Sequence, residues 1–95
     1  MKVVWSEDAV NDYHQNIEYL LEERPVRSAA NFIEEVDAVI ELIKKWPEIY
    51  PESDYIGIRR AVIRKQITLF YKLENTAIYL VRFWNTFQNP ESFQA

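Results

Sequence analysis

The sequence predicts an α+β domain in which an N-terminal β-strand is followed by a helical hairpin and then by a three-stranded antiparallel meander, with the helices on one face of the sheet. Three observations predict this fold. Apolar residues recur at steps of three and four between Val10 and Ile43, which is the helical period. After Gly57 the period changes to two, which is typical of strands. Prolines interrupt the pattern at residue 25 and within the segment 47–57.

The first strand and the first helix are predicted at the N-terminal end. Residues 3–5 form a short apolar run that stops at Ser6. Serine is a favourable N-cap, and the two acidic residues after it would lie in the first helical turn, where the helix dipole favours negative charge. The helix is expected to end near Glu23, and its apolar face is predicted from Val10, Tyr13, Ile17, Leu20 and Leu21.

The second helix is predicted to begin near Pro25, because proline suits the first turn of a helix, and to end at Pro47. The link between the two helices is short, so they should lie antiparallel as a hairpin. The apolar face of the second helix is predicted from Ala29, Ile33, Val36, Ile40 and Ile43.

Three strands are predicted at residues 59–64, 67–73 and 76–84. Lys65-Gln66 is expected to form the first turn and Glu74-Asn75 the second, where asparagine tolerates the positive φ of a tight turn. We expect one antiparallel sheet. Alternation groups Arg60, Val62 and Arg64 on one face of the first strand, and Ile78, Leu80, Arg82 and Trp84 on one face of the third.

Length and composition limit the possible functions. The chain has 95 residues, so we expect a single domain over residues 1–95 with a core that needs no disulfides. There is no cysteine and only one histidine, which argues against a metal site, and we expect no cofactor. The N-terminus does not resemble a signal peptide and no apolar run is long enough to span a membrane, so we expect a cytoplasmic protein with no membrane partner.

Charge is divided unevenly along the chain. Residues 1–56 contain five basic and thirteen acidic residues, a net charge of −8, whereas residues 57–95 contain six basic and two acidic residues, a net charge of +4. The segment 56–72, IGIRRAVIRKQITLFYK, holds five of the eleven basic residues and no acid. Two interpretations stay open, a surface that binds a partner and an ordinary solvated sheet face. The low pI, about 5.0, argues against direct binding of nucleic acid and favours a protein partner.

Several short motifs carry a family resemblance that covers nearly the whole chain. They are A-x-x-F-I from residue 29, W-P at 46–47, G-I-R-R at 57–60, L-F-Y-K-L at 69–73 and F-W-N-T-F-Q-N-P at 83–90. With the order of elements, they resemble the RelE/ParE superfamily of toxins from type II toxin–antitoxin systems, and most closely its ParE-like, plasmid-stabilisation branch.

The resemblance implies a toxin that inhibits its target by binding. Members of the ParE-like branch poison DNA gyrase and are held inactive by an antitoxin whose extended segment wraps the helices and sheet of the toxin. We therefore expect a cognate antitoxin and a cellular target protein, with DNA gyrase as the expected target. The residues expected to contact one or the other are Arg59, Arg60, Arg64, Arg82, Trp84, Asn85, Phe87 and Asn89.

Two alternatives remain. The RelE branch of the superfamily cleaves mRNA on the ribosome, which requires an acid, a base and cations that stabilise charge on phosphate. By this resemblance, the chain carries uncharged residues where such enzymes carry Lys, Arg or Tyr, namely Ala61, Thr68, Phe87 and Phe93. This alignment weakens the nuclease interpretation, and we assign no catalytic residue. The second alternative is a decayed toxin that still binds its antitoxin but is no longer toxic.

Overall fold

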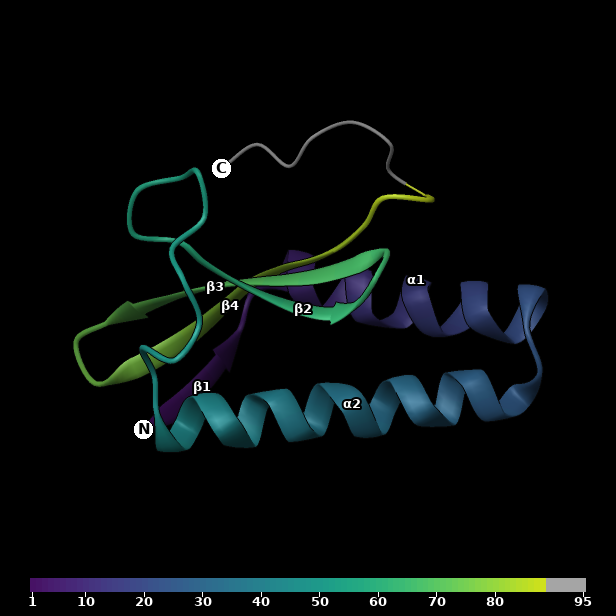
Figure 1. Cartoon of the computed structure of the whole chain (residues 1–95), viewed down its shortest axis with the longest axis horizontal. Helices are drawn as coiled ribbons and strands as arrows, with labels where there is room; N and C mark the ends of the chain where they lie inside the picture. The colour runs from purple at the N-terminus through teal and green to yellow at the C-terminus, as the bar shows by residue number, and fades with distance from the viewer. Residues whose placement is uncertain (89–95) are drawn as a thin grey trace.

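The computed structural model describes residues 1–88 and shows the predicted order of elements (Figure 1). The α+β fold class is confirmed. The elements are β1 (Lys2–Trp5), α1 (Glu7–Glu23), α2 (Val26–Lys45), β2 (Arg59–Arg64), β3 (Ile67–Glu74) and β4 (Ala77–Asn85). Within the described residues, no helix is long and apolar enough to cross a membrane.

The four strands form one sheet in the order β1-β4-β3-β2. Strands β2, β3 and β4 make the predicted antiparallel meander, but β1 pairs with β4 in parallel, from Lys2 opposite Ala77 to Trp5 opposite Leu80. The sheet is therefore mixed, and the prediction of a wholly antiparallel sheet was wrong for β1. A short apolar run carries no information about strand direction, which is decided here by where the helical hairpin returns the chain.

Both helices cover the same face of the sheet, as predicted (Figure 1). Ser6 caps α1 as expected, because its Oγ accepts a hydrogen bond from Ala9 N at 2.9 Å. The core between the layers is built from side chains that are at most 1% exposed, including Leu20, Phe32, Val36, Ile43, Ile67, Leu69, Tyr71, Ile78, Leu80 and Phe83.

The buried face of α1 agrees with the prediction in part, since Leu20 is buried and Tyr13 and Ile17 pack against the core. Val10 is 37% and Leu21 48% exposed, although both were assigned to the apolar face. The residues that α1 buries are Ala9, Asp12, Asn16 and Leu20, which also recur at steps of three and four. Two of these four are polar, and a prediction based on apolar residues alone therefore placed parts of the buried face one residue too far along the sequence.

Two turn positions have the positive φ that their residue types tolerate. Asn75, between β3 and β4, has φ of 56°, which confirms the predicted role of asparagine in this tight turn. Gly57 has φ of 79° at the point where the long connection after α2 enters β2.

Two β-bulges change which side chains face the helices. In β2 the register shifts between Val62 and Arg64, so that Arg64 lies opposite the buried Ile67. In β4 the shift lies opposite Phe70 and Tyr71, which pair with Arg82 and Leu80. Each extra residue reverses the alternation that follows it. The predicted grouping of Arg64 with Arg60, and of Arg82 with Leu80, was therefore wrong.

Candidate partner-binding surface

The register of the meander brings basic and aromatic side chains together on the face of the sheet opposite the helices. Arg60 lies opposite Phe70, which in turn lies opposite Arg82. The adjacent row contains Val62, Thr68 and Trp84. We call these six residues the outer sheet surface. Arg60 and Val62 are exposed and the other four are half-buried.

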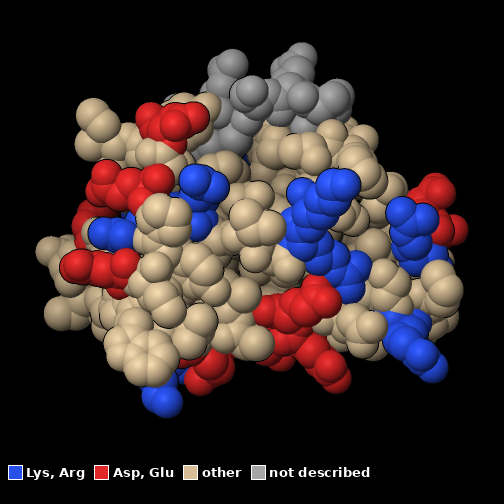
Figure 2. Space-filling model, in the orientation of Figure 1, with Lys and Arg blue, Asp and Glu red and all other residues tan. Residues whose placement is uncertain are grey.

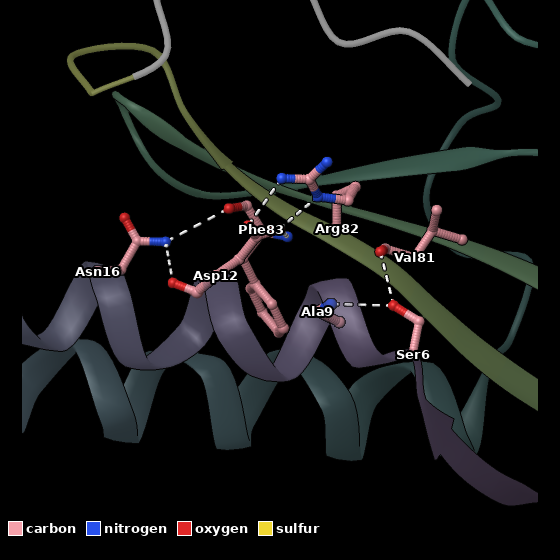
Figure 3. Close-up of polar contacts among 7 residues, drawn as sticks. All are labelled: Ser6, Ala9, Asp12, Asn16, Val81, Arg82 and Phe83. Atoms are coloured by element: carbon pink, nitrogen blue, oxygen red, sulfur yellow. Dashed lines mark hydrogen bonds and ion pairs between the residues drawn. The ribbon is translucent and has the colours of Figure 1, made fainter.

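Arg82 is held on this surface by an acidic side chain of α1. Its Nε and Nη2 lie 2.6 and 2.8 Å from the two carboxylate oxygens of Asp12, whose side chain is 7% exposed. Asp12 also accepts a hydrogen bond from the backbone N–H of Phe83 at 3.0 Å (Figure 3). The guanidinium of Arg82 lies 5.0 Å from the ring centroid of Trp84. The hydrogen bond to Asp12 raises the pKa of Arg82 above its ordinary value, so the guanidinium stays charged.

Side chains of α1 and its N-cap close the edge of β4 that β1 leaves uncovered. Strand β1 pairs with β4 only as far as Leu80. Beyond it, the hydroxyl of Ser6 donates to Val81 O at 2.9 Å and the amide of Asn16 donates to Phe83 O at 3.3 Å (Figure 3). Asp12 accepts from the N–H of Phe83 and Asn16 donates to its carbonyl oxygen, so both backbone groups of this residue are bonded to α1. This edge is therefore protected against addition of another strand.

Asn85 ends β4 and is 1% exposed. Its Nδ2 donates to Asn16 Oδ1 at 2.8 Å. Its Oδ1 accepts hydrogen bonds from the backbone N–H groups of Phe87 and Gln88, at 2.8 and 3.3 Å. The side chain of Phe87 is 62% exposed. Asn85 thus lies inside the fold, whereas Phe87 is presented at the surface.

Arg64 is engaged with α2. Its Nε lies 2.6 Å from Glu35 Oε1, and its Nη1 and Nη2 donate to the hydroxyl and the carbonyl oxygen of Ser28 at 3.0 and 2.7 Å. The side chain is only 15% exposed, and its guanidinium carbon lies 5.6 Å from the ring centroid of Phe32. Arg64 therefore connects β2 to α2 through hydrogen bonds and an ion pair.

Arg59 holds the connection between α2 and β2. Its Nη1 donates to Tyr50 O at 2.6 Å and to Glu48 O at 3.3 Å. The backbone N–H of Arg60 donates to Pro51 O in the same connection, at 3.0 Å. The side chain of Arg60, in contrast, is exposed and makes no hydrogen bond or ion pair with any other residue between 1 and 88.

The eight predicted contact residues therefore fall into different groups. Arg60, Arg82 and Trp84 share the outer sheet surface, and Phe87 is exposed just beyond β4. Arg59, Arg64 and Asn85 make contacts within the fold, and Asn89 lies outside the described residues. Sequence reasoning missed Asp12 and Asn16, although polar residues at helical spacing among apolar ones were a visible signal.

The charge division along the sequence is partly neutralised inside the molecule. Basic residues of the sheet pair with acidic residues of the helices in the Arg64–Glu35 and Arg82–Asp12 ion pairs. On the face seen in Figure 2, Lys and Arg side chains lie in separate groups, several of them beside acidic side chains. Of the five basic residues in 56–72, Arg64 joins the two layers and Arg59 holds the connection after α2, and the basic side chains do not form one continuous patch on this face.

The sequence matches the model of a known family, described as ParE toxin of the type II toxin–antitoxin system parDE, over residues 3–90. The chain belongs to this ParE toxin family. The match spans nearly the whole chain and agrees with the resemblance of the sequence motifs. A comparison with curated protein sequences gave no match.

Solved structures of similar fold come from several toxin–antitoxin systems. The chromosomal ParDE system of P. aeruginosa superposes with a TM-score of 0.69 at 13% identity, covering 90% of this chain and 95% of that chain. A YoeB/ParE toxin from Agrobacterium tumefaciens gives 0.67 at 18% identity, covering 90% and 98%. The E. coli DinJ–YafQ complex gives 0.61 at 14% identity, covering 92% and 94%. At these identities the likeness establishes the shared fold.

The alignment with RelE-type nucleases must be corrected at one position. Ala61 is 0% exposed and lies opposite Leu69 in the core, so a side chain at this position faces the helices. An uncharged residue there says nothing about cations on the outer sheet surface. Thr68 does lie on that surface, Phe87 is exposed two residues after the end of β4, and Phe93 lies outside the described residues. Within residues 1–88, no group of acidic side chains or His14 is arranged to hold a metal ion.

Proposed function

We propose that this ParE-family chain is the toxin of a type II toxin–antitoxin pair, that a cognate antitoxin holds it inactive, and that the free toxin inhibits DNA gyrase by binding to it. The observation that carries the proposal is the match to the ParE toxin family over residues 3–90. The match spans nearly all of the chain, so the proposal concerns the whole domain. Catalysis by side chains of the toxin has no part in the proposed mechanism.

The antitoxin is proposed to bind at the exposed part of β2. This strand lies at one edge of the sheet, and the N–H of Arg60 points away from β3, since it donates to Pro51 O. By the two-residue period of a strand, the backbone groups of Val62 point the same way. The Val62 side chain is 55% exposed, and the charge of Arg60 is not neutralised by another residue between 1 and 88. Pro51 and Glu52 already cover the strand edge at Arg59 and Arg60, so an acidic, extended segment would find a charge partner in Arg60 and backbone groups to bond at Val62.

The gyrase contact is proposed for the other end of the outer sheet surface and the residues after β4. Trp84 and Phe87 are aromatic, and aromatic side chains often supply much of the free energy at protein interfaces. Phe87 is 62% exposed, and Trp84 is half-buried under the guanidinium of Arg82. Arg59, Arg64, Arg82 and Asn85 are proposed to act through the shape of the surface, because their polar groups already have partners within the fold. Asn89, outside the described residues, stays a predicted contact.

One observation favours a second candidate function, a RelE-like mRNA endonuclease. Arg60 and Arg82 flank Phe70 on the outer sheet surface, and Lys72 lies on the same face with its Nζ 5.7 Å from the ring centroid of Tyr79. Cations stabilise charge that develops on phosphate, and a tyrosine or lysine can transfer a proton. The family match favours the ParE mechanism over this one.

Inducing the chain alone in a bacterial host tests the proposal. Filamentation with induction of the DNA-damage response is expected, because a poisoned gyrase leaves broken DNA. Rapid arrest of translation with cleaved mRNA would instead support the endonuclease, and unaffected growth at a verified protein level would support a decayed toxin. Co-expression of a small adjacent open reading frame should restore growth. Failure of any adjacent frame to protect would contradict the antitoxin part of the proposal.

A further inference from the structure

Two asparagine side chains form a hydrogen-bonded pair in the interior, at the point where the chain leaves β4. Asn16 of α1 is 2% exposed and Asn85 is 1% exposed. Their amides meet at 2.8 Å, with Asn85 Nδ2 donating to Asn16 Oδ1. Burying polar amides is costly unless their hydrogen bonds are made, so such a pair strongly favours one arrangement of its surroundings.

The direction of every hydrogen bond in this pair is determined by the backbone around it. The N–H groups of Phe87 and Gln88 can only donate, so Asn85 must turn its Oδ1 toward them and its Nδ2 toward Asn16. Asn16 then uses its oxygen for Asn85 and its Nδ2 for the carbonyl oxygens of Asp12 and Phe83, at 2.9 and 3.3 Å. A continuous series of hydrogen bonds thus connects α1 to residue 88.

We propose that Asn16 and Asn85 are positioning residues that set the direction in which the chain leaves β4 and thereby present Phe87 to the target of the toxin. The inference rests on the function proposed above. Phe87 is 62% exposed, two residues beyond the end of β4, and its own N–H is held by Asn85. The residue between them is also held, because Thr86 N donates to Gln66 O, in the turn between β2 and β3, at 2.9 Å. An exposed aromatic ring on a backbone that is already ordered loses less conformational entropy when it binds.

A purely structural role for the pair predicts something different. In that case Asn85 would only fill the core, and its replacement would lower stability without a specific effect on residues 87 and 88. The positioning role predicts a local loss of order at these two residues and a functional dependence between Asn85 and Phe87. Both can be measured on the full chain.

Amide hydrogen exchange tests the local effect without any partner. In Asn85→Leu, which has the same branching of heavy atoms but no acceptor, the amides of Phe87 and Gln88 should exchange at least about tenfold faster than in the wild type, while that of Leu69 in β3 stays protected. Val36→Ala, a core change remote from the exit, should leave the protection of residues 87 and 88 as it is. Asn85→Ala serves if the leucine variant does not fold. Unchanged exchange at both amides in a folded variant would overturn the inference.

A double-mutant cycle tests the functional part, with inhibition of purified DNA gyrase as the readout. Phe87→Ala and Asn85→Ala should each raise the toxin concentration needed for half-inhibition about tenfold, which is the size of one lost interface contact. The double variant should need no higher concentration for half-inhibition than the less active of the two single variants, because both changes remove the same presented ring. The positioning role would be overturned if the two losses of inhibition multiplied in the double variant, or if Phe87→Ala kept full activity. A wild-type chain that does not inhibit gyrase would instead overturn the proposed function, and the exchange result would still show whether the pair orders the exit.

Discussion

Asp12 and Arg82 join α1 to the outer sheet surface through a two-pronged ion pair, with nitrogen–oxygen distances of 2.6 and 2.8 Å. The carboxylate bonds to β4 beyond the part of its edge that β1 covers. The guanidinium lies beside the same edge, near the ring of Trp84. The same contact therefore supports the fold and fixes the position of a residue on the proposed binding surface.

Removing this carboxylate should destabilise the domain strongly. Asp12→Ala leaves the guanidinium of Arg82 and the N–H of Phe83 without their acceptor, so we expect a loss of about 2 to 3 kcal/mol in the free energy of unfolding. Urea denaturation followed by circular dichroism measures it. Glu18→Ala removes an exposed acid from the same helix and should have little effect. Equal stability of the two variants would contradict the assigned role of Asp12.

Arg60 should matter for binding and not for folding. Its side chain is exposed, so Arg60→Ala should keep the urea midpoint of the wild type but weaken the affinity for the antitoxin about tenfold. Titration calorimetry at low and high salt gives the affinity and its electrostatic part. Lys65→Ala is the matched control, because it removes an exposed charge from the adjacent turn. Equal losses in both variants would indicate general attraction by charge and count against a specific contact.

Arg64 should show the opposite behaviour. Arg64→Ala removes the contacts with Glu35 and Ser28 that join β2 to α2, and should cost about 2 kcal/mol of stability. Arg64→Lys should recover only a minor part, because an ammonium group cannot reproduce the planar, multiple contacts of a guanidinium. Thermal and urea unfolding of the two variants provide the comparison. Full recovery by lysine would show that charge alone is sufficient.

The turn between β3 and β4 depends on the backbone conformation of Asn75. At φ of 56°, Asn75→Ala should cost about 1 kcal/mol because a Cβ is disfavoured in the left-handed region, whereas Asn75→Gly should be close to neutral. Equilibrium unfolding distinguishes the two variants. An alanine variant as stable as the glycine variant would mean that the turn can adopt another conformation.

The sequence was sufficient for the order of elements, because periods of 3.6 and 2 and the proline and asparagine positions are local signals. It was insufficient for the faces of β2 and β4. The bulges next to Arg64 and Arg82 depend on strand pairing, and each one reversed the alternation on which the prediction relied. The buried face of α1 was incompletely predicted for a related reason, since Asp12 and Asn16 are buried where β4 offers them hydrogen-bonding partners.

The candidate surface was predicted in part. Local charge drew attention to β2, but charge alone could not separate Arg60, which is exposed, from Arg64, which is held by α2. That difference arises from a contact between residues 29 positions apart in the chain. The pairing of Arg60 and Arg82 across Phe70 likewise follows only from the strand register.

A gyrase supercoiling assay with the purified chain tests the central proposal most directly. Relaxed plasmid DNA, purified gyrase and ATP are incubated with increasing toxin, alone and after pre-mixing with the cognate antitoxin. The account predicts loss of supercoiling with the toxin alone, accumulation of cleaved DNA, and full recovery with the antitoxin. Normal supercoiling at a large molar excess of folded toxin would contradict gyrase as the target.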